Sequence, residues 1–192
     1  MAAEEVGDTY FDELLERSMI LPGAGVNHHH SGKVDSCQLH DIIREICILK
    51  AREENLVFTL EDGCCLSSTQ GPIRHLVISS NWKRDKDVFD SMLDLSQVRS
   101  LTVYGEWRPY FISEKMRFIR VLDLGHTLQF RERHLDKVVQ LHHLRYLSIR
   151  NCDYNWLLPN SIENLSHLQT MDIKGTRIVE LPTTIIKLRK LQ

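Results

Sequence analysis

The residues best suited to chemistry lie in one polar stretch of the first half. Residues 28–30 are three consecutive histidines followed by Cys37, but successive residues in a flexible loop rarely fix a tetrahedral zinc site. Gly32-Lys33 is the only Gly-Lys pair, and Asn27 and Val34 replace the first glycine and the final serine or threonine of a phosphate-binding loop. No Ser-His-Asp or Cys-His arrangement is readable. The sequence therefore predicts no metal site, no cofactor held by this chain alone and no enzyme.

Composition and cysteine usage restrict the class of protein further. A net charge of −2 gives no overall attraction to nucleic acid or anionic membranes. No apolar stretch approaches the roughly 18–20 residues of a membrane helix, and the acidic start is not a secretory signal. The cysteines are odd in number and two are adjacent, which argues against a disulfide framework; they are Cys37, Cys47, Cys64, Cys65 and Cys152. We expect reduced thiols in a cytoplasmic protein.

A repeating aliphatic pattern occupies the second half of the chain. Each copy has an aliphatic residue, two variable residues, an aliphatic, one variable residue and an aliphatic. Copies start at 73, 98, 119, 144 and 168, and a truncated one at 191, so the spacings are 25, 21, 25, 24 and 23 residues. These fall within the range of about 20–29 residues for leucine-rich repeats. The middle aliphatic residues are Leu76, Leu101, Leu122, Leu147 and Met171. We expect them to form one continuous row, because a single repeat buries too little to offset its ordering entropy.

A second register strengthens the repeat assignment. Three residues after the last aliphatic, such repeats place a small polar residue or cysteine that turns inward and bonds the backbone. Those positions hold Asn81, Thr127, Cys152 and Thr176, with Glu106 as the exception. The predicted fold over 66–192 is an α/β leucine-rich-repeat solenoid of about five repeats plus a truncated sixth, with short parallel strands and mostly irregular return segments. We expect the tryptophans to seal turns; they are Trp82, Trp107 and Trp156.

The sequence of residues 1–62 predicts a partial winged-helix region that consists of helices and a hairpin. Apolar residues at helical spacing from Val6 to Met19 indicate a helix that starts near Asp8 and ends at Pro22-Gly23. A polar loop leads to a returning strand at 36–39. A second helix begins near His40, with inward residues expected at Ile42, Ile43, Ile46, Cys47 and Leu49. Leu56, Phe58 and Leu60 alternate as in a strand.

Two segments of this region resemble the nucleotide-binding leucine-rich-repeat (NB-ARC) immune receptors of plants. Residues 4–21 look like the last segment before the signature hairpin of that family, and Leu39-His40-Asp41 is similar to its Met-His-Asp motif. The resemblance implies that, in an intact receptor binding ADP or ATP, His40 faces the phosphates of ADP and Asp41 supports the site and could cap its helix. It also implies a defence function in which the winged-helix part senses nucleotide state, while the repeats restrain the switch and bind partners.

The second position of the repeats holds a column of arginines. These are Arg74, Arg99, Arg120 and Arg145, followed by Gln169. Neighbouring strands lie about 4.7–4.9 Å apart and screening reaches about 8 Å, so these charges repel one another. We hypothesise that an acidic protein surface offsets them, on a neighbouring nucleotide-binding domain or a pathogen effector. The alternative is that their stems pack along a solvated face. Other expected partner-binding residues are Tyr146, Arg150, Asp172 and Lys174.

Two other functions stay open at this point. A winged-helix nucleic-acid-binding module would need a basic recognition helix, but the candidate helix is balanced in charge, with Arg44, Lys50 and Arg52 against Glu45, Glu53 and Glu54. We therefore expect no nucleic acid partner. The other alternative is a free-standing repeat adaptor without receptor function. Because the sixth repeat stops at Gln192 without a cap, we expect a fragment or a truncated gene product.

Overall fold

The computed structural model describes residues 3–23, 37–54, 56–62, 72–92, 94–125, 127–152 and 157–192. The chain divides into two compact units, Met1–Glu54 (unit 1) and Asn55–Gln192 (unit 2). Several residues discussed above lie outside the described ranges, namely residues 28–30, Gly32, Lys33, Cys64, Cys65 and Trp156.

Unit 1 contains two helices and one antiparallel hairpin. Helix α1 spans Ala3–Glu16 and helix α2 spans Asp41–Glu53. Between them, strand β1 (Ile20–Pro22) pairs with strand β2 (Cys37–Leu39). The helix, hairpin, helix order is confirmed. However, α1 begins before Asp8, so the prediction that Asp8 starts the helix was wrong. The alanine and glutamates ahead of it are strong helix formers and extend the helix toward the N-terminus.

The apolar face of α2 is exposed, contrary to the sequence expectation. The exposed fractions of Ile42, Ile46 and Leu49 are 64, 50 and 58%, and Cys47 is exposed as well. Among the described residues of unit 1, Ile20 is the only buried apolar one. A unit of this size has too little surface to cover both helices. The amphipathic spacing therefore predicts the helix correctly, but not its burial.

Unit 2 is built on a six-stranded parallel sheet. Its strands are β3 (Val57–Leu60), β4 (His75–Ile78), β5 (Ser100–Val103), β7 (Val121–Asp123), β9 (Tyr146–Ser148) and β10 (Thr170–Asp172). They lie side by side in this order. The register places the five predicted core residues opposite one another in turn, Leu76, Leu101, Leu122, Leu147 and Met171. The continuous row expected from the sequence is therefore confirmed.

The repeat sheet begins earlier than the sequence suggested. Strand β3 pairs in parallel with β4, and Phe58 lies opposite Leu76 at the start of the core row. Residues 57–60 therefore belong to the repeat sheet, although the sequence analysis included them in a first region ending at 62. Their alternating pattern predicts a strand but does not reveal which neighbour it pairs with, because that depends on residues far along the chain.

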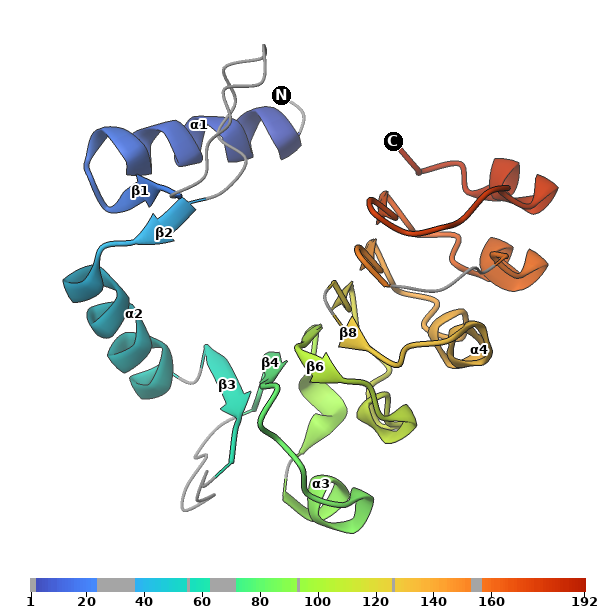
Figure 1. Ribbon diagram of the computed structural model, residues 1–192, viewed down its shortest axis with the longest axis horizontal. Coiled ribbons are helices and arrows are strands. Elements are labelled where there is room, and N and C mark those ends of the chain that lie inside the picture. Colours follow the sequence, from blue (N-terminus) through green and yellow to red (C-terminus); the bar gives the residue numbers. More distant parts are fainter. Residues whose placement is uncertain are drawn as a thin grey trace. The chain divides into compact units, whose positions relative to one another are not determined.

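The return segments form short helical turns on the other side of the sheet (Figure 1). They include helix α3 (Lys86–Met92), helix α4 (Leu135–Val138) and several 3₁₀ turns. Two further strands, β6 (Gly105–Glu106) and β8 (Thr127–Leu128), pair beside the main sheet. An aromatic layer lies under these segments, where Trp107 packs against Phe111 and Phe130 with ring centroids 5.9 and 5.1 Å apart. Trp82 and Trp107 are buried in connecting segments, as expected.

The inward polar position behaves as predicted at Thr127, Cys152 and Thr176, whereas Asn81 is exposed and accepts from the Asp62 amide at 3.2 Å. The Thr127 hydroxyl is buried between two carbonyl oxygens, 2.5 Å from that of Leu124 and 3.2 Å from that of Val103. The buried Cys152 thiol lies 3.6 Å from the Leu124 oxygen, and burial raises its pKa to about 11. Thr176 donates to the Ile173 oxygen at 2.7 Å. Each of these three side chains adds a hydrogen bond to a backbone carbonyl where the chain leaves the strand.

Candidate functional site

The arginine column, defined as Arg74, Arg99, Arg120 and Arg145, is a regular feature of the backbone. The amide of Arg99 donates to the oxygen of Arg74 at 2.8 Å, that of Arg120 to Arg99 at 2.8 Å, and that of Arg145 to Arg120 at 2.7 Å. Gln169 and Gln192 continue the same ladder at 2.8 and 2.9 Å. The four side chains are exposed, and none forms an ion pair with a described residue. The structure therefore aligns four cations, without ion-pair partners in the described part of the chain, at the amino ends of the strands.

A row of rings runs along the same edge, two residues ahead of the column in each repeat. The rings of Phe118 and His143 are stacked at 22° with centroids 6.3 Å apart, and those of His143 and His167 lie 6.1 Å apart. Lys190 extends the row, with its Nζ 3.0 Å from Nδ1 of His167. We use the name ring row for the three rings and the ammonium group that follows them, namely Phe118, His143, His167 and Lys190. Sequence reasoning missed it, although its members share one register: each immediately precedes the first aliphatic residue of a repeat.

A second polar group lies at the opposite ends of the strands. Arg150 donates from Nε and Nη2 to Oδ2 of Asp172 at 2.9 and 2.5 Å, and the Lys174 amide donates to Oδ1 at 2.9 Å. Partial burial pulls the pKa of Asp172 upward, but these hydrogen bonds outweigh it and hold the pKa below its usual range. The carboxylate is therefore charged at neutral pH. Half-buried Tyr146 belongs to the same face, and burial raises its pKa.

The predicted partner-binding residues thus form two groups rather than one. The four arginines lie at the amino ends of the strands, whereas Arg150, Asp172 and Lys174 lie at or beyond the carboxyl ends. In the second group the arginine is already matched by an aspartate. In the first group, by contrast, no described residue forms an ion pair with any of the four arginines.

His40 and Asp41 lie in unit 1, where strand β2 leads into helix α2. His40 is exposed and precedes the helix; its carbonyl accepts from Arg44 at 2.8 Å, and its Nδ1 lies 3.4 Å from the Ile42 amide. The cap position is therefore occupied by His40, and Asp41 is the first helical residue instead of the cap. Both are close to a helix N-terminus, where unpaired amides and the helix dipole favour anions.

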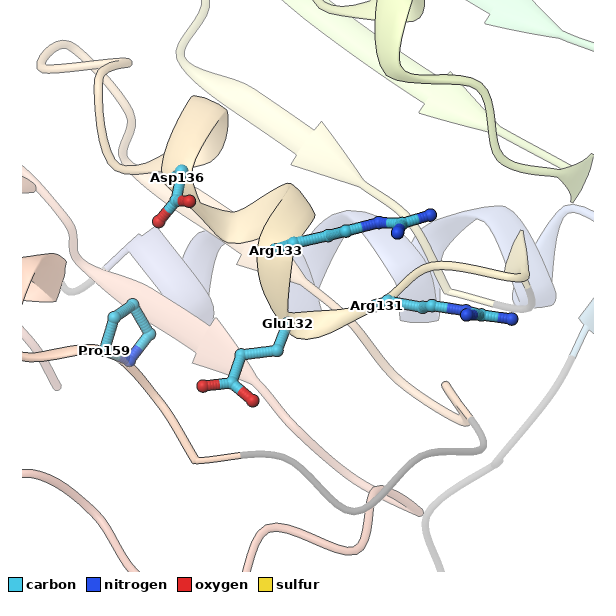
Figure 2. Close-up of a pocket in the computed structure, with 5 residues that line it drawn as sticks. All are labelled: Arg131, Glu132, Arg133, Asp136 and Pro159. Atoms are coloured by element: carbon cyan, nitrogen blue, oxygen red, sulfur yellow. The ribbon is translucent and has the colours of Figure 1, made fainter.

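One pocket that sequence reasoning missed lies among the return segments of unit 2. It has a volume of about 410 Å³ and is lined by Arg131, Glu132, Arg133, Asp136 and Pro159. The carboxylates of Glu132 and Asp136 point toward the side of Pro159, while both arginines extend the other way (Figure 2). No sequence pattern joins residues 131–136 to Pro159, since only the stacking of successive repeats brings them together. The lining residues are two acids and two bases without a nucleophile, so this pocket suggests no reaction.

Neither a metal-binding cluster nor a membrane-spanning helix is found among the described residues. In that part of the chain, no group of three or more histidine, cysteine, aspartate or glutamate side chains is arranged to hold a metal ion. None of the helices there has the length and apolar content needed to cross a bilayer.

A regular ladder of parallel strands with a recurring inward polar residue after several of them defines a repeat protein. A family model described as "Leucine-rich repeat region" matches residues 97–192, and one described as "Disease resistance protein Winged helix domain" matches residues 1–47. The chain belongs to the leucine-rich-repeat family. This fold suggests binding between proteins.

The curated relatives that match the chain are plant disease-resistance proteins. "Disease resistance protein Pik-2" of Oryza sativa subsp. japonica is 32% identical over 192 residues, covering 100% of this chain and 18% of that protein. "Putative disease resistance RPP13-like protein 3" of Arabidopsis thaliana is 31% identical over 202 residues, covering 100% of this chain and 22% of that protein. The chain therefore spans about a fifth of the length of these relatives.

Solved structures also match the repeats. One is the leucine-rich-repeat ectodomain of the plant membrane receptor kinase GASSHO1/SCHENGEN3 from Arabidopsis thaliana. Its TM-score is 0.42 at 15% sequence identity, and the match covers 63% of this chain and 17% of that one.

Proposed function

We propose that this chain is the regulatory junction of a cytoplasmic plant disease-resistance receptor. In this proposal unit 1 takes part in sensing a bound adenine nucleotide, while unit 2 holds the receptor in check and binds protein partners. The similarity to disease-resistance proteins along the whole chain supports the overall assignment. In this proposal the chain does not hydrolyse nucleotide by itself, because its sequence contains no phosphate-binding loop.

The observation that carries the partner-binding role is the arginine column. Four exposed guanidinium groups on neighbouring rungs repel one another, and no described residue neutralises them. An acidic surface laid across the rungs relieves this repulsion and pairs with each group. We propose that this surface belongs to the nucleotide-binding domain of the receptor, which lets the repeats act on the switch directly.

The nucleotide-sensing role is proposed for His40 and Asp41. A histidine ring at the amino end of α2 has a donor to offer a phosphate, and the first amides of the helix are near it. Neither residue can bind nucleotide with useful affinity alone, so this role depends on a phosphate-binding domain in the same receptor.

Binding to a nucleotide-binding domain in trans tests the proposal. The purified 192-residue chain is titrated against the ADP-loaded nucleotide-binding domain of the rice relative, and Kd is measured over a range of salt concentrations. The double variant Arg99→Glu/Arg120→Glu should weaken binding at least tenfold and flatten its salt dependence. The matched control Lys83→Glu/Arg177→Glu changes charge equally at exposed positions outside the column. Equal binding by both variants would refute the role of the column.

A further inference from the structure

The edge that carries the arginine column holds more positive charge than the column itself. The segments that enter the successive strands contribute three further cations, Arg117, Arg189 and Lys190. The same segments contain three histidines, His142, His143 and His167. At the rung positions 96–99, 117–120, 142–145, 166–169 and 189–192 there is no acidic residue. In a chain with a net charge of −2, this is a marked segregation of charge.

The ring row and the arginine column lie close enough to interact. Lys190, His143 and Arg145 all contribute electrostatically to lowering the pKa of His167, with Lys190 the largest cause and partial desolvation adding to it. Arg145 belongs to the column and His167 to the ring row, on neighbouring rungs. The two rows therefore act as one surface, the cationic edge, defined as the arginine column plus the ring row.

We propose that the cationic edge binds an acidic protein segment with uptake of a proton by His167 of the ring row, so that acidification tightens the complex. This inference rests on the proposed role of the arginine column and adds its regulation. In the free chain, the Lys190 ammonium, 3.0 Å from the His167 ring, and the other neighbouring cations oppose protonation of this exposed imidazole. Carboxylates laid along the edge reverse that balance, because an opposite charge favours the charged form. Binding and protonation then reinforce each other through linkage.

The geometry favours a protein segment over single-stranded nucleic acid. Nucleic-acid-binding platforms offer open aromatic faces on which bases stack. Here the faces of Phe118 and His143 are turned toward one another, with centroids 6.3 Å apart. A base inserted between two rings needs about twice the 3.4 Å rise of stacked bases, or about 6.8 Å. The space between these two rings is therefore too narrow for a base, which favours carboxylates over bases as ligands of this edge.

The groups facing His167 are defined in the structure. His143 lies between the rings of Phe118 and His167. His167 is faced by His143, by the Lys190 ammonium and by the charge of Arg145. No carboxylate is among these neighbours in the described chain, so an acidic partner is the group that would change the protonation of His167.

A glutamate-rich peptide is the suitable probe. Glutamate, with an ordinary pKa of about 4.3, stays ionised between pH 7.5 and 6.0, whereas a phosphopeptide titrates near pH 6 and would obscure the result. Kd for a labelled 12-residue peptide is measured with the whole chain by fluorescence anisotropy at both pH values. Because exposed ion pairs are individually weak, we expect affinity to rise about threefold to tenfold at pH 6.0.

Variants separate this inference from the function it rests on. His143→Gln/His167→Gln should keep the affinity measured at pH 7.5 and lose the rise at pH 6.0, with an unchanged melting temperature. The control His75→Gln alters an exposed histidine of strand β4 and should keep the full rise. Peptide binding that stays constant with pH would overturn proton uptake while leaving the arginine column as an acid-binding surface. Failure of the peptide to bind at either pH would overturn both. Tighter binding of oligothymidylate than of the peptide would overturn the choice of a protein partner.

Discussion

Units 1 and 2 have equally clear amphipathic patterns, but only unit 2 buries its apolar residues. In unit 2 the aliphatic row and the aromatic layer join into one core that runs through successive repeats. In unit 1 the apolar face of α2 is open to solvent. The difference teaches that periodicity decides which element forms, whereas burial depends on a second surface of matching shape. Each coil of unit 2 has such surfaces on its neighbouring coils.

The largest effect is expected when a substitution in the core of unit 2 is compared with one at an exposed position of unit 1. Leu122→Ala removes a fully buried side chain from the centre of the row and should lower the free energy of unfolding of unit 2 by about 3 kcal/mol. Ile46→Ala truncates an aliphatic side chain that is half exposed in α2 and should cost less than about 0.5 kcal/mol. Urea unfolding followed by circular dichroism measures both. Similar losses for the two variants would break the contrast between the units.

A smaller test compares two threonine hydroxyls. Thr127 is buried and bonds two carbonyl oxygens, whereas the exposed Thr9 hydroxyl bonds only the Glu5 oxygen of its own helix, at 2.8 Å. Thr127→Val removes a buried hydroxyl donor from the Leu124 and Val103 oxygens and should cost about 1–2 kcal/mol. In Thr9→Val, water replaces the lost donor, so the change should stay within about 0.5 kcal/mol. The same urea titrations measure both, and a neutral Thr127→Val would show that the inward polar position is not needed for stability.

The features that follow from the repeat period could be predicted from the sequence. The period fixes the core row, the arginine ladder and the inward position of Thr127 and Cys152, because each depends on one residue per coil in a constant register. Features set by contacts between distant residues could not be predicted in this way. Strand β3 could be identified from its alternation, but not its pairing with β4, and the pocket beside Pro159 has no local signal.

The same distinction applies to the candidate site, where some features could be predicted from the sequence and others could not. The column is visible in the sequence because its members are chemically identical. The ring row has the same regularity but changes from phenylalanine to histidine to lysine, so only the ring contacts reveal it as one feature. At His40, the sequence places a motif next to a helix but does not identify the cap. The helix begins at Asp41, one residue earlier than a cap at Asp41 would place it, which gives the cap position to His40 in place of Asp41.

The smallest expected effect concerns two histidines of unit 2, one buried and one exposed. The pKa values of both are lowered, but for different reasons. For His134 the main cause is burial, with Arg133, Arg131 and Lys137 as lesser causes, and its Nδ1 accepts from the Arg131 amide at 2.9 Å. For His167 the main cause is the Lys190 charge. In both cases the folded chain binds protons less readily than the unfolded chain. Each histidine therefore costs no stability above its ordinary range near pH 6.5, and stability falls as the pH drops below it.

Removing one lysine near each histidine separates the two causes. Lys190→Gln removes the principal cause at His167, so its pKa should return toward the ordinary value and its contribution to acid destabilisation should shrink. Lys137→Gln removes only the least of the causes at His134, so that pKa should stay low, because burial continues to disfavour the charged ring. Titration of the imidazole Cε1 protons by nuclear magnetic resonance measures both shifts. If Lys137→Gln restored the ordinary pKa of His134, charge rather than burial would control that site, and the return segments would then be no better shielded from water than the edge of the sheet.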